Sequence, residues 1–417
     1  MNLKSKLRNK WLVIKAIGPK KSLMIPFALV FVLGLKFLTI FRDVRIHTVK
    51  NHRLGHFAIN TELSRLDSIE KHTTTQRNPI DIYCFQTAKH SNSYLAKMWK
   101  RELFVLKSPF GQFTYDIAKR FLPTTVQRST NIDKDGLLIS HSPSLTLNDS
   151  ELKVGRNFLD QLEEKSETGF VCLNVRDPRF LAETIPVGWK SNRDWSYHDF
   201  RNSDIQTYRV AAETLAERGY SVFRMGAIVR DSFDSKNPKV IDYATNAMRT
   251  EFLDIFLGAE CTFTISVGSG WDALPTIFRR PILQVNALPI FELSTITLQL
   301  VVYPKTLVDA NSGTSLSLIE ILSRNAATLM TANSYKEAGV EIRDLSSEEL
   351  VEAVTEMAQR VEGTFVETPE QKEMQAKLKR ILSTHPKLQP SPNYYPIRAQ
   401  FASCFLSRYP NFLDGLD

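Results

Sequence analysis

Residues 260–286 restrict this chain to a small set of folds, because they contain a strand, a tight loop, a short helix and a second strand in direct succession. Residues 261–267 alternate apolar and small polar side chains, as a buried strand does. A glycine-bearing loop at 268–270 ends that strand, and Asp272 suits the start of a helix. Residues 282–285 then form an apolar strand. This succession predicts an α/β fold built on a parallel sheet.

The loop at 268–270 lies at the carboxyl end of its strand, which is where open α/β sheets bind ligands. Glycines let the backbone approach a phosphate closely, and the amides at the start of the next helix favour negative charge. An ordinary strand-to-helix turn explains the same residues equally well, since neither a Walker loop nor a GxGxxG motif is present. On the phosphate interpretation, the candidate donor-binding residues here are Ser266, Gly268, Ser269, Gly270 and Asn286.

The chain is 417 residues long, which exceeds what one hydrophobic core usually supports. We therefore expect two Rossmann-like β/α/β domains, an N-terminal one at 43–165 and a C-terminal one at 166–365. A leader with an apolar segment occupies 1–42. The C-terminal tail, 366–417, carries large aromatic residues that would be costly to leave in water, so we expect it to pack back on the body.

The positive net charge of +8 is concentrated at the start of the chain. Residues 1–21 carry seven Lys and Arg and no acidic residue, which leaves 46 basic and 45 acidic residues in the rest. Because the body is nearly neutral, it offers no basic groove, and we expect no nucleic-acid partner. The four cysteines are widely scattered and form no cluster with histidines, so the sequence predicts no metal site and no cofactor.

The first half repeats the strand, glycine loop and helix pattern. A strand at 44–49 is followed by Arg53, Gly55 and His56, and a helical pattern takes over from Phe57. Arg53, Gly55 and Asn60 are therefore candidate residues of an acceptor-side loop. The second half opens with a strand at 169–175 that ends in an arginine and an aspartate. Later strands end in further polar residues, so the candidate donor site also includes Arg176, Arg224, Gly226, Asp242 and Tyr243.

Two β/α domains with glycine loops at their strand ends suit a ligand held in a cleft between them, and a nucleotide diphosphate fits the residues present. Arginines and helix-end amides can stabilise a departing diphosphate without a metal. An acceptor hydroxyl needs a base, for which the candidates are His56, Glu62 and Asp177. His56 is the first choice because it follows a loop glycine. A structural histidine at a helix start is the alternative, and Asp177 with Arg176 also fits a surface ion pair at a turn.

Several segments, among them NHRLGHFAINTEL, VCLNVRDPRF and FASCFLSRYPNFL, resemble a bacterial family of glycosyltransferases found among surface-polysaccharide genes. The resemblance covers about residues 53–412 and implies a GT-B-like arrangement with the donor nucleotide mainly on the second domain. The strand end is also similar to the HxR element of fucosyltransferase-type enzymes, which implies that Arg176 contacts the donor phosphate. Asn174 stands where that element has its histidine, so no histidine role carries over. The resemblance stops at the reaction class, and our own interpretation of the chain adds a glycan or lipid-linked acceptor.

Residues 23–41 form an apolar run interrupted by Lys36, and its length fits a bilayer span. A single-pass anchor, a helix lying in the membrane interface and a buried core helix are the alternatives. Because nucleotide-sugar donors are expected in the cytoplasm, we favour an interfacial anchor through residues 1–42 on the cytoplasmic face of a bacterial inner membrane. A nucleotide-sugar 2-epimerase-like hydrolase and a non-catalytic membrane scaffold are the alternative functions.

Overall fold

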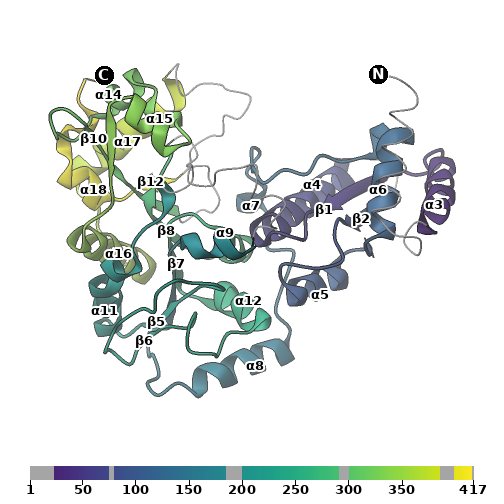
Figure 1. The fold of residues 1–417 in the computed structure, drawn as a ribbon, viewed down its shortest axis with the longest axis horizontal. Coiled ribbons are helices and arrows are strands. Elements are labelled where there is room, and N and C mark those ends of the chain that lie inside the picture. Colours follow the sequence, from purple (N-terminus) through teal and green to yellow (C-terminus); the bar gives the residue numbers. More distant parts are fainter. Residues whose placement is uncertain (1–22, 75–78, 185–199, 291–299, 386–398, 416–417) are drawn as a thin grey trace. The chain divides into compact units, whose positions relative to one another are not determined.

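The computed structural model describes the chain apart from residues 1–22, 75–78, 185–199, 291–299, 386–398 and 416–417 (Figure 1). It divides into two compact units, residues 1–131 and 132–417. The predicted α/β class with parallel sheets is confirmed in both units.

Unit 1 contains a three-stranded parallel sheet in the order β1-β2-β3, formed by Val44–Val49, Ile80–Phe85 and Val105–Leu106. Alternate residues of its strands point to opposite faces. Val44, Ile46, Ile82 and Cys84 pack against α6 (Phe110–Phe121) and α3 (Met24–Leu38). On the other face, His47 and Asp81 contact side chains of α4 (Thr61–Thr74). The remaining elements of this unit are η1 (His56–Asn60), α5 (Ser93–Glu102) and η2 (Pro123–Thr125).

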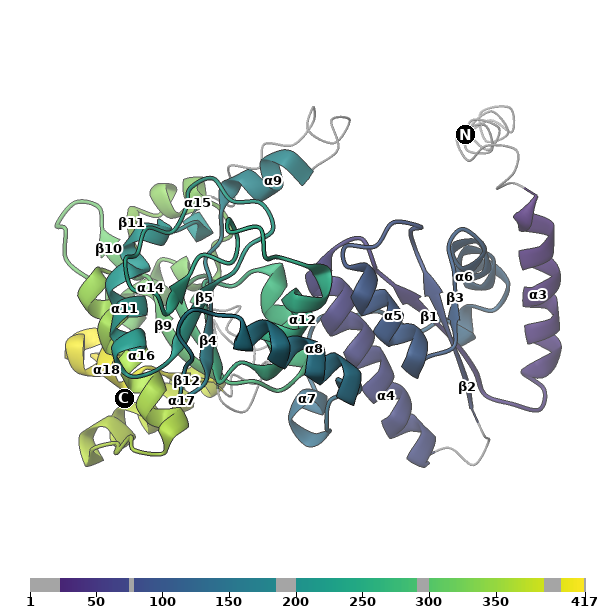
Figure 2. The same cartoon turned by 90° about the horizontal axis from the view of Figure 1, so that it is seen from below.

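The apolar run near the start of the chain forms α3, which packs on α6 through Ala28, Val32 and Leu35 (Figure 2). The helix has 15 residues, which corresponds to about 22 Å and is shorter than the roughly 30 Å core of a bilayer. No helix in the part of the chain that the structure describes is both long and apolar enough to cross a membrane.

Unit 2 is built on a seven-stranded sheet in the order β12-β9-β8-β7-β4-β5-β6, and all its strand pairs are parallel. The chain first adds β5 and β6 on one side of β4, then returns to add the others on the opposite side. The sheet therefore reverses its direction of growth between β4 and β7. The strands are β4 (Phe170–Asn174), β5 (Ser221–Arg224), β6 (Val240–Ile241), β7 (Phe263–Ser266), β8 (Ile282–Ala287), β9 (Leu300–Pro304) and β12 (Gln400–Phe401).

Both faces of this sheet are covered, which explains why its strands are apolar throughout. Val171 and Leu173 point to the face covered by α11 (Arg209–Glu217) and α16 (Ser347–Glu362), which lie side by side in Figure 1. Phe170 and Cys172 point to the face covered by α8 (Asp149–Asp160) and α12 (Glu251–Glu260). Because α8 packs on α12, the helix that sequence assigns to the first domain belongs to unit 2, and the division falls at 131 rather than at 165.

The C-terminal segment packs on unit 2, as its aromatic residues led us to expect. Phe401, Phe405 and Phe412 are buried in the main core, and β12 extends the sheet beside β9. Tyr409 Oη donates to Glu349 Oε1 over 2.6 Å. Other elements of unit 2 are α7 (Leu137–Ser140), α9 (Pro178–Thr184), η4 (Ile205–Tyr208), η5 (Gly270–Asp272), α13 (Ala273–Ile277), β10 (Thr306–Asp309), α14 (Leu318–Ser323), η7 (Ala326–Thr328), α15 (Ala332–Glu337), β11 (Val340–Arg343), α17 (Pro369–Thr384), α18 (Ser403–Arg408) and η8 (Pro410–Leu413).

Candidate functional site

The point where the order of unit 2's sheet reverses lies between β4 and β7, and ligands of open parallel sheets bind outside the carboxyl ends of the strands at such a point. Asn174 and Ser266 are the last residues of these two strands and are paired in register. The chain segments that leave this pair carry Arg176 on one side and the loop Gly268 to Gly270 on the other. The topology thus brings together two segments that are about ninety residues apart in sequence.

A hydrogen-bonded network ties these two strand ends together. Asn174 Nδ2 donates to Ser269 Oγ at 2.6 Å and to Asp272 Oδ1 at 2.5 Å. The Ser269 amide donates to Asp272 Oδ2 at 2.6 Å, and the Ser269 side chain caps η5. Gly268 N–H donates to Ser266 Oγ, and its φ of +80° favours glycine. Asn174 is therefore a structural amide that fixes the glycine loop.

Asp272 is the half-buried acid of this network, and sequence analysis assigned it only to a helix start. Burial raises its pKa to about 6, although hydrogen bonds from Ser266, Ser269 and Asn174 favour its ionised form. Its carboxylate already accepts the Ser269 amide, one of the amides expected to receive a phosphate. The Ser-x-x-Asp spacing of a capping box is the sequence signal that identifies this arrangement. The phosphate interpretation of the loop thus depends on Arg176 and Gly270 more than on Ser269.

Arg176 and Asp177 follow β4 directly and are both partly exposed. Asp177 Oδ1 accepts the amide of Arg179, and its Oδ2 accepts the amide of Arg230 at 2.7 Å. Asp177 therefore attaches the end of β4 to the loop that follows β5. Since both carboxylate oxygens are engaged by backbone amides, its predicted role as a base is not part of our proposal, whereas Arg176 remains a candidate.

Arg224, a predicted phosphate contact, is only 1% exposed. Its guanidinium pairs with Asp242 at 3.0 Å and donates to the carbonyl of Asp231. Asp242 also accepts the amide of Phe233. A Cβ at position Gly226 would approach Val229 to 2.6 Å, so close packing requires that glycine. In this conformation Arg224, Gly226 and Asp242 hold the loop that follows β5, and none of the three presents a group to a ligand.

Two further predicted donor-site residues are part of the core. Tyr243 is fully buried, and its hydroxyl contacts Asp254 and the carbonyl of Thr250. Asn286 is 2% exposed, donates to Tyr208 Oη at 2.8 Å and accepts the amide of Leu345. Their polar groups are engaged by the protein itself. A sequence pattern locates residues at strand ends but does not report which of them already have protein partners.

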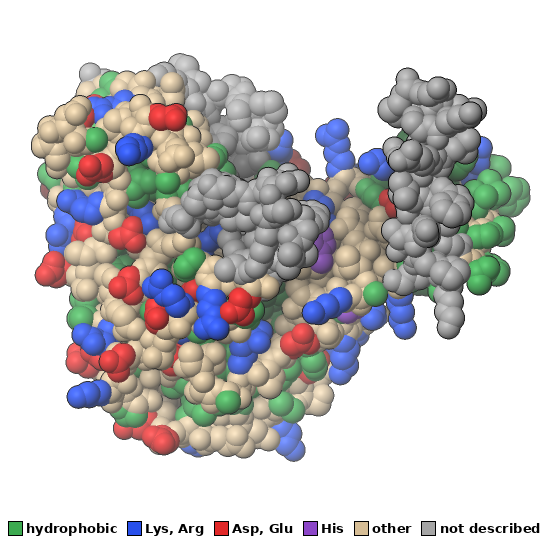
Figure 3. Space-filling view, viewed as in Figure 1, with side chains coloured by type: hydrophobic (Ala, Val, Ile, Leu, Met, Phe, Trp, Pro, Cys, Tyr) green, Lys and Arg blue, Asp and Glu red, His purple; other side chains and the backbone are tan. Residues whose placement is uncertain are grey.

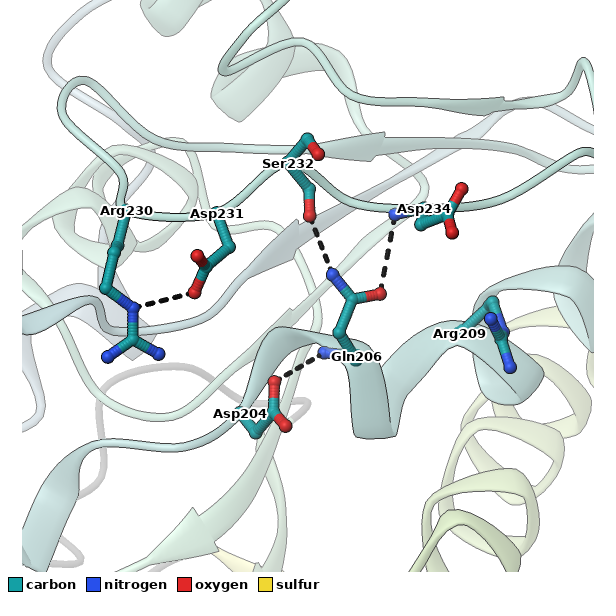
Figure 4. Close-up of a pocket in the computed structure, with 7 residues that line it drawn as sticks. All are labelled: Asp204, Gln206, Arg209, Arg230, Asp231, Ser232 and Asp234. Carbon is teal, nitrogen blue, oxygen red and sulfur yellow. Dashed lines mark hydrogen bonds and ion pairs between the residues drawn. The ribbon is translucent and has the colours of Figure 1, made fainter.

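An open hollow of about 770 Å³ lies beside the loop that follows β5 (Figure 4). Gln206 bridges the carbonyl of Ser232 and the amide of Asp234, and Arg230 pairs with Asp231. The side chains that line this hollow are polar, and none was predicted from sequence as a site residue. The lining consists of Asp204, Gln206, Arg209, Arg230, Asp231, Ser232 and Asp234.

In unit 1, His56 begins η1 after the loop that leaves β1. Its Nδ1 lies 3.1 Å from Asn60 Oδ1, while Asn60 Nδ2 donates to Ser129 Oγ at 2.8 Å. With the Asn60 amide in this orientation, Nδ1 carries the proton and Nε2 keeps its lone pair. Burial lowers the pKa of His56 below its usual 6.5, as do Lys50 and Arg53, against the hydrogen bond with Asn60. A neutral imidazole with an available Nε2 is suited to accept a proton.

The other predicted residues of unit 1 differ in how exposed they are to solvent. Arg53 is exposed, and its carbonyl accepts the amide of Phe57. Gly55 has ordinary helical angles, φ −57° and ψ −49°, so backbone strain does not require a glycine there. Glu62 is completely buried in the first turn of α4, which makes it a poor base for an acceptor arriving from solvent. His56 is thus the base candidate with the best access.

The described residues contain no group of three or more His, Cys, Asp and Glu placed to hold a metal ion. No known family model matches the sequence, and no curated protein matches it. Several solved structures are similar to this chain, all at low sequence identity. E. coli ADP-heptose LPS heptosyltransferase II has a TM-score of 0.40 and 12% identity over 76% of this chain and 99% of that chain.

A family 9 glycosyl transferase from Veillonella parvula has a TM-score of 0.44 and 10% identity, over 76% of this chain and 98% of that chain. E. coli heptosyltransferase WaaC, solved with ADP-2-deoxy-2-fluoro heptose, has a TM-score of 0.30 and 11% identity, over 70% of this chain and 98% of that chain. These three structural neighbours are glycosyltransferases, at a level of similarity from which neither a shared activity nor a shared ligand follows.

Proposed function

We propose that this protein is a metal-independent glycosyltransferase that binds the diphosphate of a nucleotide-sugar at the β4–β7 strand ends. The observation that carries the proposal is the placement of Arg176 and the glycine loop on either side of the paired residues Asn174 and Ser266, where the sheet order reverses. An arginine at that position can stabilise the departing diphosphate by charge-assisted hydrogen bonds.

His56 supplies the second chemical requirement, a base for the acceptor hydroxyl. Its Nε2 is unprotonated in the tautomer that Asn60 imposes, and its lowered pKa keeps the ring neutral at pH 7. As the acceptor oxygen attacks the anomeric carbon, the bond from that carbon to the diphosphate breaks and Nε2 takes the hydroxyl proton. We further propose a glycan or lipid-linked acceptor in the surface-polysaccharide synthesis of a bacterium, at the cytoplasmic face of the inner membrane.

A thermal-shift screen of the full chain tests the donor site. The ligands are UDP, ADP, GDP, CMP and dTDP with their sugars, because a ligand that binds only the native state stabilises it by about 2.7 kcal/mol at a hundredfold excess over Kd. We expect one nucleotide class to raise Tm. Arg176→Ala should abolish that shift, whereas Arg179→Ala, which removes a nearby exposed arginine paired with Glu183, should keep it.

The outcomes separate the alternatives. A shift that survives Arg176→Ala would contradict the assignment of the diphosphate contact. Free sugar and nucleotide released rapidly without any acceptor would support the hydrolase-like alternative instead. No shift with any nucleotide, together with unchanged glycan production by cells carrying Arg176→Ala, would support a non-catalytic scaffold.

A further inference from the structure

The outer face of α3 is as apolar as the inner face that packs on α6. A helix on the surface of a soluble protein normally shows polar residues to water, and one that is apolar on all sides is normally buried. Here Phe27 is 71% exposed, Val30 68% and Phe37 65%. Their spacing of three and seven residues places them on one side, opposite Ala28, Val32 and Leu35.

This outer face extends beyond the helix itself. Leu23, Leu33, Ile40 and Phe41 are also more than half exposed, and together with Phe27, Val30 and Phe37 they form what we call the α3 outer face. Hydrophobic side chains gather along the edge of the molecule formed by α3 (Figure 3). Lys36, on the flank of the face, is the only charged residue of the helix. A contiguous apolar surface of this kind marks an interaction site.

The charge of the surrounding sequence identifies the partner's chemistry. Residues 1–42 contain nine Lys and Arg and no acidic residue, whereas the rest of the chain carries 44 basic and 45 acidic residues. The complementary surface is therefore apolar and negatively charged. A second copy of the chain would carry the same excess of positive charge in its residues 1–42, which opposes dimerisation through this segment. An anionic bilayer combines acyl chains with negatively charged headgroups and fits both properties.

We propose that the α3 outer face docks on an anionic lipid surface. Phe27, Val30 and Phe37 enter the boundary between headgroups and acyl chains, and the Lys36 ammonium extends to the lipid phosphates. The inner face stays packed on α6, so the helix lies along the membrane surface and carries unit 1 with it. This inference concerns a face of unit 1 outside the candidate donor site, and it holds whether or not the protein transfers a sugar.

Vesicle co-sedimentation of the full chain tests this inference, with 70:30 phosphatidylcholine and phosphatidylglycerol compared with phosphatidylcholine alone. The test variant is Phe27→Asp with Phe37→Asp. The control is Val154→Asp with Val366→Asp, which adds the same charge at exposed positions of unit 2, 54% and 84% exposed. We expect stronger binding to the anionic vesicles and a loss on the order of tenfold or more in the test variant, because apolar burial is replaced by buried charge. The control should bind like the natural chain.

A second measurement identifies the contact directly. In Phe37→Trp, tryptophan emission should shift to the blue on adding anionic vesicles and be quenched by brominated acyl chains. Unchanged vesicle binding by the Phe27 and Phe37 double variant would overturn the proposal. So would a change from dimer to monomer in that variant with lipid binding unaffected, since the face would then be an interface between copies.

Discussion

At the scale of single residues, the candidate site depends on which polar groups already have partners within the protein. Asn174, Ser269 and Asp272 hydrogen-bond to one another, and Arg224 is paired with Asp242 through Nη1, while its Nε is buried without a partner among the described residues. Polar groups that are engaged by the protein in this way are not available to a ligand. His56 differs, because only one of its two ring nitrogens is engaged by Asn60. The orientation of one amide thus decides the chemistry available to the imidazole.

The titration of His56 gives a prediction at this scale. We expect the pKa of His56 to lie below 6.5 when the ring Cε1 proton is followed by NMR. A rate that depends on His56 as a base should then fall as the pH drops through this pKa. Asn60→Asp should raise the pKa, since a carboxylate beside Nδ1 stabilises the imidazolium. Asn60→Asp should accordingly move the acid limb of the pH–rate profile upward. A His56 pKa above 6.5 in the natural chain, or one unmoved by Asn60→Asp, would contradict the assigned pair.

At the scale of elements, close approaches of helices determine which glycines are needed. Gly155 of α8 lies against Phe256 of α12, and a Cβ there would come within 2.0 to 2.4 Å of the ring. A Cβ added at Gly34 of α3 would have no atom within 4 Å. Both glycines are in helix interiors, where alanine is intrinsically favoured by about 1 kcal/mol. Their contexts predict opposite effects of the same substitution.

We therefore expect Gly155→Ala to lower the free energy of unfolding by about 1 to 3 kcal/mol, because α8 and α12 must separate to admit the methyl group. Gly34→Ala should raise it by up to about 1 kcal/mol. Urea unfolding monitored by circular dichroism measures both. Equal effects of the two substitutions would show that α8 and α12 do not pack as closely as the structure has them.

Much of the element order was predictable because hydrophobic periodicity reports it directly. The strand predicted at 261–267 appears as β7, and Asp272, the predicted helix start, lies in η5 directly before α13. The sequence places the α8 segment within 43–165, whereas α8 packs on α12 of unit 2, because a helix pattern does not say which unit the helix packs against. Arg224 and Asn286 lie at strand ends as expected, yet their burial depends on neighbours distant in sequence.

At the scale of the whole molecule, each unit has its own hydrophobic core. The core of unit 1 gathers Val44, Ile46 and Ile82 beneath α6, and unit 2 has cores on both faces of its larger sheet. Units with separate cores violate the two-state condition. We expect differential scanning calorimetry to give a calorimetric enthalpy larger than the van't Hoff enthalpy. A bound nucleotide should shift only one of the transitions, and that transition belongs to unit 2. A single transition with equal enthalpies would contradict this division.

The sequence by itself determined the α/β class, the parallel sheets, the apolar N-terminal helix and the concentration of positive charge before it, because periodicity and composition are local properties. Only the tertiary structure decided that β4 lies next to β7, which places Arg176 beside the glycine loop. It also decided which polar residues are already satisfied by the protein and which side of α3 faces outward. These features arise from contacts between residues far apart in the chain, and no local pattern encodes them.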